Sequence, residues 1–254
     1  MADVTGINGS DMYGRIASGN RINRAADDAA GLTISEKLQE QVGGLNQATE
    51  NAKEGVDALN ISDGALAQIT DNLQRIHELS LKASNSFMYT PNDLAAMQDE
   101  IDGLMKGIED IAKGTEYNTL KLLDGNMADM DLATNPDGTG MSIKMANATL
   151  EELGIDGYDV TGDFDINRIT SAIDKVSEQR SKLGAATNAL EYSINQNSLT
   201  AENTLAAKSS LADLDIPKAI SEQKKNKVLD DYQLMMQRQQ MKDEEEKAKG
   251  IFNF

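Results

Sequence analysis

The sequence predicts a mainly α-helical protein, a long antiparallel helical rod or coiled-coil bundle with a small β-hairpin region at its tip. Apolar residues recur at alternating steps of four and three in both halves of the chain, the period at which helices pack along their length. Aromatic residues make up only 4% of the 254 residues, which favours long helices over a thick globular core. Between the two periodic halves lies a stretch rich in Gly, Asn and Asp in which the helical period disappears.

The first periodic stretch predicts a helix from Gly31 to Ala83. Its apolar seam consists of Leu38, Val42, Leu45, Thr49, Ala52, Val56, Leu59, Leu66, Ile69, Leu73, Ile76 and Leu79. Pro91 and Asn92 are turn formers and interrupt the pattern. A second helix is expected from about Asp93 to Gly114, with a seam of Leu94, Met97, Ile101, Leu104, Ile108 and Ile111.

The non-helical region covers about residues 117–165. "TLKLL" and "MSIKMA" are candidates for short strands, with "NPDGTG" between them as a turn. The aspartates of "DMDLATNPDGTG" suggest calcium, but an EF-hand glycine belongs five residues after the first aspartate. Gly138 comes nine residues after Asp129, and no Glu closes the loop. We therefore interpret this segment as a turn.

A third periodic run begins at Ile166, with a seam of Ile166, Ile169, Ile173, Val176, Leu183, Leu190 and Ile194. The last segment is polar and rich in Gln and Met. The pattern divides the chain into residues 1–30, an N-terminal segment of a terminal domain; 31–209, a rod domain with the short β region; and 210–254, the C-terminal helix of the terminal domain. A long thin bundle has little core of its own, so such chains commonly complete their burial against copies of themselves.

The formal net charge of −18 argues against nucleic acid and anionic membranes as partners. No apolar stretch approaches the roughly 20 residues of a membrane span. The N-terminal residues lack the basic start and apolar middle of a cleaved secretory signal, so we expect a cytosolic protein or one exported by a route that needs no such signal. Without Cys there is no disulfide framework and no thiolate metal site.

The densest group of charged residues lies in "SGNRINRAADDAAGLTISEKL", residues 18–38. Asp27 and Asp28 could form an acid/base pair, but neighbours on a helix point about 100° apart and cannot share one substrate. Arg24 lies three and four residues before them, which is the spacing of surface ion pairs. Because the surrounding alanines allow close approach of another backbone, we interpret the run as a helix face that packs against another chain.

Nothing else supports an enzyme, a metal site or a bound cofactor. His77 is the only histidine, which excludes a site with two imidazoles, and we interpret it as a residue at the rim of a helix. The sequence contains no GxxxxGK[ST] phosphate loop and no GxGxxG motif. A hidden catalytic site at the tip, built on Asp129 or Asp131, is the least favoured alternative.

Several motifs, in order along about residues 18–220, resemble bacterial flagellin. The opening run "SGNRINRAADDAAGLTISEKL" resembles the family's N-terminal signature, and "NAKEGVDALNISDGALAQITDNLQRIHELSLKASN" continues it. "EYNTLKLLDG" is similar to the turn into the family's β-hairpin region. "SAIDKVSEQRSKLGAATNALEYSINQNSLTAENTLAAKSSLADLDIPKAI" is similar to its C-terminal rod helix and the start of its terminal helix.

The resemblance implies a structural subunit that polymerises head-to-tail into the hollow flagellar filament for motility. It implies export through the flagellar apparatus with a chaperone, an extracellular location, and contacts with filament cap and junction proteins. The opening run would be the bend between the terminal and rod helices, where family members touch their neighbours. Its candidate subunit-interface residues are Arg21, Arg24, Asp27 and Asp28.

The segment "LQRIHELSLKA" is similar to the flagellin segment recognised by the vertebrate innate immune receptor for flagellin. The positions that match are Gln74, Arg75 and Leu79, with Glu100 on the neighbouring helix. Two departures from the family pattern are a short N-terminal segment, with 17 residues before Ser18, and a highly charged C-terminal segment. They leave open an alternative, a non-polymerising flagellin-like surface protein with a signalling or adhesion role.

Overall fold

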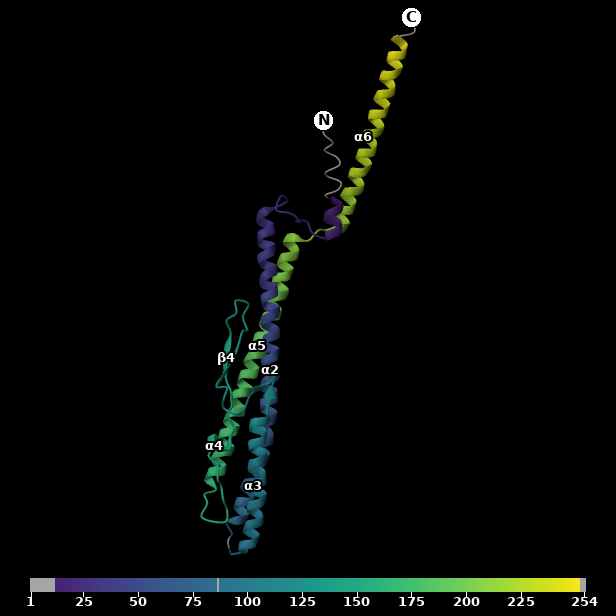
Figure 1. The fold of residues 1–254 in the computed structure, drawn as a ribbon. Coiled ribbons are helices and arrows are strands. Elements are labelled where there is room, and N and C mark those ends of the chain that lie inside the picture. Colours follow the sequence, from purple (N-terminus) through teal and green to yellow (C-terminus); the bar gives the residue numbers. More distant parts are fainter. Residues whose placement is uncertain (1–11, 86, 252–254) are drawn as a thin grey trace. The chain divides into compact units, whose positions relative to one another are not determined.

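The computed structural model describes residues 12–85 and 87–251. The chain forms two compact units (Figure 1). Of the described residues, the first unit contains 12–42 and 202–251, and the second contains 43–85 and 87–201. The first eleven residues of the expected N-terminal segment and the last three of the C-terminal helix lie outside the described residues.

Helix α2, Ala29–Ala83, is the first long helix of the sequence pattern. Its seam is confirmed: except for the half-buried Leu38 and Val56, all the seam positions are buried. Leu66, Ile69, Leu73 and Ile76 are fully enclosed in the core that α2 forms with α3 and α5. The alternating spacing keeps these side chains on one stripe, so each turn of the helix contributes to the same core.

Helix α3, Pro91–Gly114, begins with a capping box. The Thr90 hydroxyl accepts a hydrogen bond from the Asp93 N–H, and the Asp93 carboxylate accepts one from the Thr90 N–H. This explains why the helix begins two residues before the expected Asp93: Pro91 occupies the first turn, where its missing N–H costs nothing. The buried face consists of Ile101, Met105, Ile108 and Ala112.

The strands differ from the sequence pattern in their pairing. β1, Glu116–Tyr117, pairs with β2, Leu120–Lys121, so only two residues of "TLKLL" are extended. β4, Met141–Lys144, pairs antiparallel with β3, Asp129–Leu132, and not with "TLKLL". The expectation that "DMDLATNPDGTG" is entirely a turn is therefore wrong, because its first four residues form β3.

The β3–β4 hairpin lies along α2 and α5 and not at an end of the helices. Two amides hold it there: Asn51 Nδ2 of α2 donates to the Ala133 carbonyl at 3.0 Å, and Asn197 Nδ2 of α5 donates to the Thr134 carbonyl at 2.9 Å. Glycine on α2 leaves room for the Leu132 side chain of the hairpin. A Cβ atom at Gly55 would come within 2.3 Å of Leu132 Cδ1.

Helix α4, Leu150–Leu153, is a single turn that the helical period did not reveal. It belongs to a segment that contributes apolar side chains to the core of the second unit, namely Leu153, Ile155, Tyr158 and Val160. The long helix α5, Asn167–Ala212, completes this core. Arg180 of α5 forms a bidentate ion pair with Asp63 of α2, with N–O distances of 2.7 and 3.1 Å.

Helix α6, Ile216–Ile251, belongs to the first unit. Together, the helices, two hairpins and seam confirm the mainly α fold class. None of the helices in the described part of the chain is apolar over enough residues to span a membrane.

Candidate functional site

The charged run of residues 18–28 is a connection between the helical residues 12–18 and α2, and not a helix face. Residues 24–27 form a turn closed by the Asp27 N–H, which donates to the Arg24 carbonyl at 2.9 Å. The run also pairs with the junction of α5 and α6. The Arg21 N–H donates to the Ala212 carbonyl at 2.7 Å, and the Leu214 N–H donates to the Gly19 carbonyl at 2.8 Å. We call residues 18–28 the connecting loop.

Asp27 holds the connecting loop together. Arg15 Nη2 donates to its Oδ1 at 2.7 Å, while the N–H groups of Asn23 and Arg24 donate to its Oδ2 at 3.1 and 3.0 Å. These interactions lower the pKa of Asp27, with the hydrogen bond from the Asn23 N–H as the largest cause. The ion pair expected between Arg24 and Asp27 is thus replaced by one with Arg15, a residue that the sequence spacing did not indicate.

Asp28 caps helix α2. Its Oδ1 accepts a hydrogen bond from the Gly31 N–H at 2.8 Å, and its carbonyl accepts one from the Leu32 N–H at 2.9 Å. A carboxylate at this position also interacts favourably with the positive end of the helix dipole. Asp27 and Asp28 thus have separate structural roles, and the two carboxylates are not arranged as an acid/base pair.

Arg21 and Arg24 differ in what they contact within the chain. Arg21 Nη2 donates to the Leu211 carbonyl at 2.7 Å, so this side chain joins the connecting loop to the end of α5. Arg24 is exposed and forms no ion pair with any residue in the described ranges. The neighbouring Ala25, Ala26 and Ala29 are also exposed, which leaves a small-residue surface beside a cation.

Helix α6 carries an uncovered apolar surface. Every side chain from residue 224 to residue 246 is exposed. At about 100° per residue, five apolar side chains fall within an arc of about 120°. We call them the α6 stripe: Val228, Leu229, Tyr232, Met235 and Met236. In the sequence, charged residues surround the stripe and mask it, although its steps of four and three from Val228 to Met235 are visible.

The four positions matched to the innate receptor lie on α2 and α3, but only three reach solvent. Gln74 and Glu100 are exposed and Arg75 is half-buried, whereas Leu79 lies in the core with 3% of its surface exposed. Arg75 links the two helices: its Nε donates to Glu100 at 2.7 Å and its Nη1 to Glu78 at 3.1 Å. Both glutamates raise the pKa of Arg75, with the hydrogen bond to Glu100 as the largest cause.

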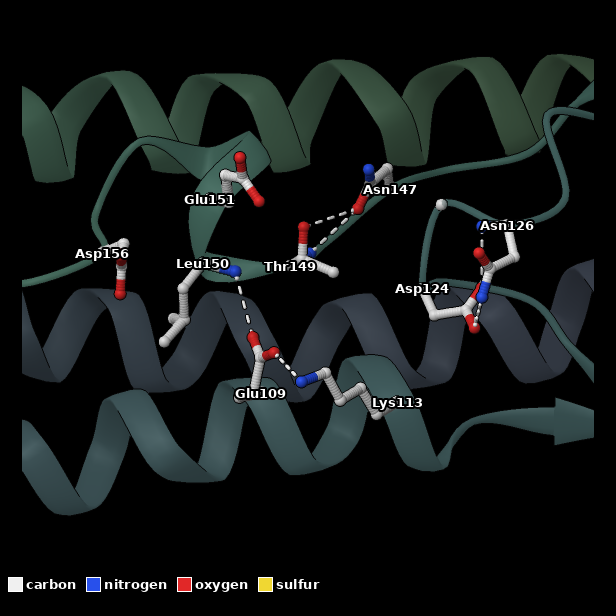
Figure 2. A pocket seen from close by; sticks show the side chains of 10 residues that line it. Glu109, Lys113, Asp124, Asn126, Asn147, Thr149, Leu150, Glu151 and Asp156 are labelled. Carbon is white, nitrogen blue, oxygen red and sulfur yellow. Dashed lines mark hydrogen bonds and ion pairs between the residues drawn. The ribbon is translucent and has the colours of Figure 1, made fainter.

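A polar pocket of about 430 Å³ lies beside α4 in the second unit (Figure 2). Glu109 bridges its two sides: Lys113 Nζ donates to Oε1 at 2.6 Å, and the Leu150 N–H donates to Oε2 at 3.2 Å. Lys113 is the largest cause of the lowered pKa of Glu109. Asn147 Oδ1 accepts from the Thr149 N–H and hydroxyl at 3.1 and 2.9 Å. These bonds position the start of α4.

Asp129 and Asp131 are the two exposed residues of β3, alternating with half-buried Met130 and Leu132. Alternation along a strand places the two carboxylates on its solvent face. Within residues 12–85 and 87–251, no cluster of three or more His, Asp or Glu side chains is arranged to hold a metal ion.

Comparisons with known proteins identify both halves of the chain. Residues 7–128 match the bacterial flagellin N-terminal helical region, and residues 166–244 match the bacterial flagellin C-terminal helical region. A flagellin of Bacillus subtilis is 36% identical, with 85% of this chain and 83% of the relative covered. A flagellin of Halalkalibacterium halodurans is also 36% identical, with 88% and 86% covered. The fold is similar to the crystal structure of Bacillus cereus flagellin, with a TM-score of 0.52 and 22% identity over 58% of this chain and 88% of that one.

Proposed function

This chain belongs to the bacterial flagellin family and is a structural subunit of the extracellular flagellar filament, and we propose that the α6 stripe and the connecting loop are surfaces through which it joins its neighbours. The single observation that supports this most is the exposure of α6. Because the side chains from 224 to 246 are all exposed, this part of the helix gains little stability from packing against the described residues. Burying its stripe against other copies would supply that stability.

The connecting loop provides the second proposed surface, with Arg21, Arg24, Asp27 and Asp28 as its charged residues. Asp27 and Asp28 support it indirectly, because they fix the turn and the start of α2. Arg24 would make the direct contact, since it is exposed and its charge is not neutralised by an ion pair within the described residues. A carboxylate of a neighbouring copy is the matching group, because the chain carries 42 acidic residues against 24 Lys and Arg.

We extend the proposal to the partners of the subunit. Residues 1–30 and 210–254 would form the terminal domain and residues 31–209 the rod. The subunit would leave the cell through the flagellar export apparatus with a chaperone, then meet the filament cap and junction proteins. Its role would be structural and not catalytic. No observation favours the non-polymerising alternative.

Recognition by the vertebrate innate receptor is a further part of the proposal. Gln74, Arg75 and Glu100 would make the contacts, because they are accessible on adjacent helices. Leu79 would act indirectly, by packing beneath this surface.

The test is seeded growth of purified subunits, followed by light scattering and electron microscopy. Val228→Ser combined with Tyr232→Ser removes two stripe side chains that are 66% and 61% exposed. The matched control is Leu234→Ser with Met241→Ser, whose side chains are 50% and 61% exposed on the opposite face of α6. The stripe variant should raise the critical concentration for growth at least tenfold and the control should not. Equal growth of the stripe variant and the native chain would refute the proposed surface.

A further inference from the structure

Two methionines lie within the α6 stripe, in positions that oxidants can reach. Met235 and Met236 are 69% and 44% exposed, next to Val228, Leu229 and Tyr232 on the same arc. Most methionines of the second unit, by contrast, are buried or half-buried, as is Met105 in the core. The chain contains no Cys and 12 Met, so thioethers are its only sulfur groups.

Exposed thioethers react with two-electron oxidants such as hydrogen peroxide. A lone pair of the sulfur forms the S–O bond, the O–O bond of the peroxide breaks, and the peroxide is reduced to water. The product is methionine sulfoxide, in which a flexible apolar side chain has become polar. A thiol-dependent sulfoxide reductase reverses the step, releasing the oxygen as water while its thiols form a disulfide.

The position of these methionines gives the oxidation a consequence for assembly. A sulfoxide on the stripe must lose its hydrogen bonds with water when a neighbouring copy covers it, and burial of an unpaired polar group is unfavourable. Two such groups lie one residue apart, so both would be brought into the same contact. If the stripe is covered in the filament, these sulfur atoms would be inaccessible there, and the reaction would be limited to free subunits.

We propose that Met235 and Met236 form a reversible oxidation site that blocks addition of the free subunit to the filament. The inference rests on the proposed role of the α6 stripe in assembly. Met241 provides an internal comparison: it is 61% exposed on the same helix but lies about 180° around the axis from Tyr232. Oxidation of Met241 therefore leaves the stripe apolar.

The experiment treats full-length subunits with hydrogen peroxide, removes the oxidant, and measures oxidation by peptide mass spectrometry and growth from native seeds. Oxidised native subunits should show at least a tenfold higher critical concentration, which methionine sulfoxide reductase restores. Met235→Leu with Met236→Leu keeps the stripe apolar at nearly the same volume, so peroxide treatment should not raise the critical concentration of this variant above its own untreated value. Met235→Gln with Met236→Gln should fail to grow without any oxidant, whereas Met241→Gln should grow normally.

Three outcomes would overturn the inference: normal growth of native subunits that are oxidised at both positions, equal peroxide sensitivity of the double Leu variant, or equal oxidation of both methionines in filaments and free subunits. The Val228→Ser, Tyr232→Ser variant separates this result from the proposed function. If that variant grows poorly while oxidised subunits grow well, oxidation of Met235 and Met236 does not block assembly, and the stripe remains an assembly surface. If that variant grows normally, the proposal that the α6 stripe is an assembly surface is refuted.

Discussion

Gly44 of α2 lies directly against Pro136 in the turn of the β3–β4 hairpin. A Cβ atom at residue 44 would come within 2.9 Å of Pro136 Cβ and within 3.1 Å of the Pro136 carbonyl oxygen. The neighbouring Gly43 has open space, because a Cβ atom there would meet no atom within 4 Å. Gly44 is therefore required by the approach of the hairpin, whereas Gly43 only lowers the stability of the helix.

Gly44→Ala should destabilise the second unit, because the ring and backbone of Pro136 cannot yield as a flexible side chain could. Overpacking costs about 1–3 kcal/mol, of which the better helix propensity of Ala recovers up to about 1 kcal/mol. Gly43→Ala gains the propensity without the clash and should raise the free energy of unfolding by about 0.5–1 kcal/mol. Thermal unfolding followed by circular dichroism measures both, and changes of the same sign would contradict this packing.

Asn197→Ala should destabilise the attachment of the hairpin to α5. Asn197 is buried, and its loss leaves the buried Thr134 carbonyl without this donor, a cost of about 1–3 kcal/mol. Asn195 is exposed two residues earlier in the same helix, so Asn195→Ala should change the free energy of unfolding by less than about 0.5 kcal/mol. Hydrogen exchange of residues 129–144 would show whether the loss is centred on the hairpin; unchanged protection there would argue against the contact.

The connecting loop should lose stability in acid. The folded-state pKa of Asp27 is below its ordinary value, so its contribution is present above the unfolded pKa of about 3.9 and is lost as pH falls through the folded pKa. Asp27→Asn should abolish this part of the pH dependence and lower stability at neutral pH. Asp28→Asn is the control, because Asn caps a helix about as well as Asp. Denaturant unfolding from about pH 2 to pH 7 measures the pH dependence of the free energy of unfolding. Identical profiles for Asp27→Asn and the native chain would exclude a stabilising role of the Asp27 carboxylate.

Arg24→Gln should impair assembly but not folding. Its side chain makes no ion pair in the described part of the chain, so the unfolding temperature should stay constant while the critical concentration for seeded growth rises several-fold. Arg21→Gln should behave differently, because it loses the hydrogen bond to Leu211 and should lower stability as well. Normal seeded growth of Arg24→Gln would remove this residue from the interface.

We expect Gln74 to contact the innate receptor directly and Leu79 to support the surface from within the core. Gln74→Ala should weaken activation of the innate receptor in a cell-based reporter assay without changing the unfolding temperature, since Gln74 is exposed. Leu79→Ala should lower the free energy of unfolding by about 2–5 kcal/mol, because it leaves a cavity in the core. If Leu79→Ala weakened activation while its stability was intact, Leu79 would be a direct contact.

The regular parts of the fold were predictable because their signal is local and repeated. Residues such as Leu66 and Ile76 recur at the helical period, and the period alone identifies the buried face. β3 was missed because Asp129 and Asp131 give it the composition of a turn, and only its pairing with β4 makes it a strand. The Arg15–Asp27 ion pair was missed because its partners are twelve residues apart and meet through a loop. The α6 stripe was overlooked since flanking charges mask its period.

The exposure of α6 also determines what happens to a subunit that escapes the polymer. Extracellular proteases cleave chains that can open locally, and a helical stretch with exposed side chains opens at less cost than one packed into a core. A stray subunit would be trimmed between residues 224 and 246, while one held by its neighbours would resist digestion. Assembled filaments would thereby persist, while unassembled subunits would be degraded.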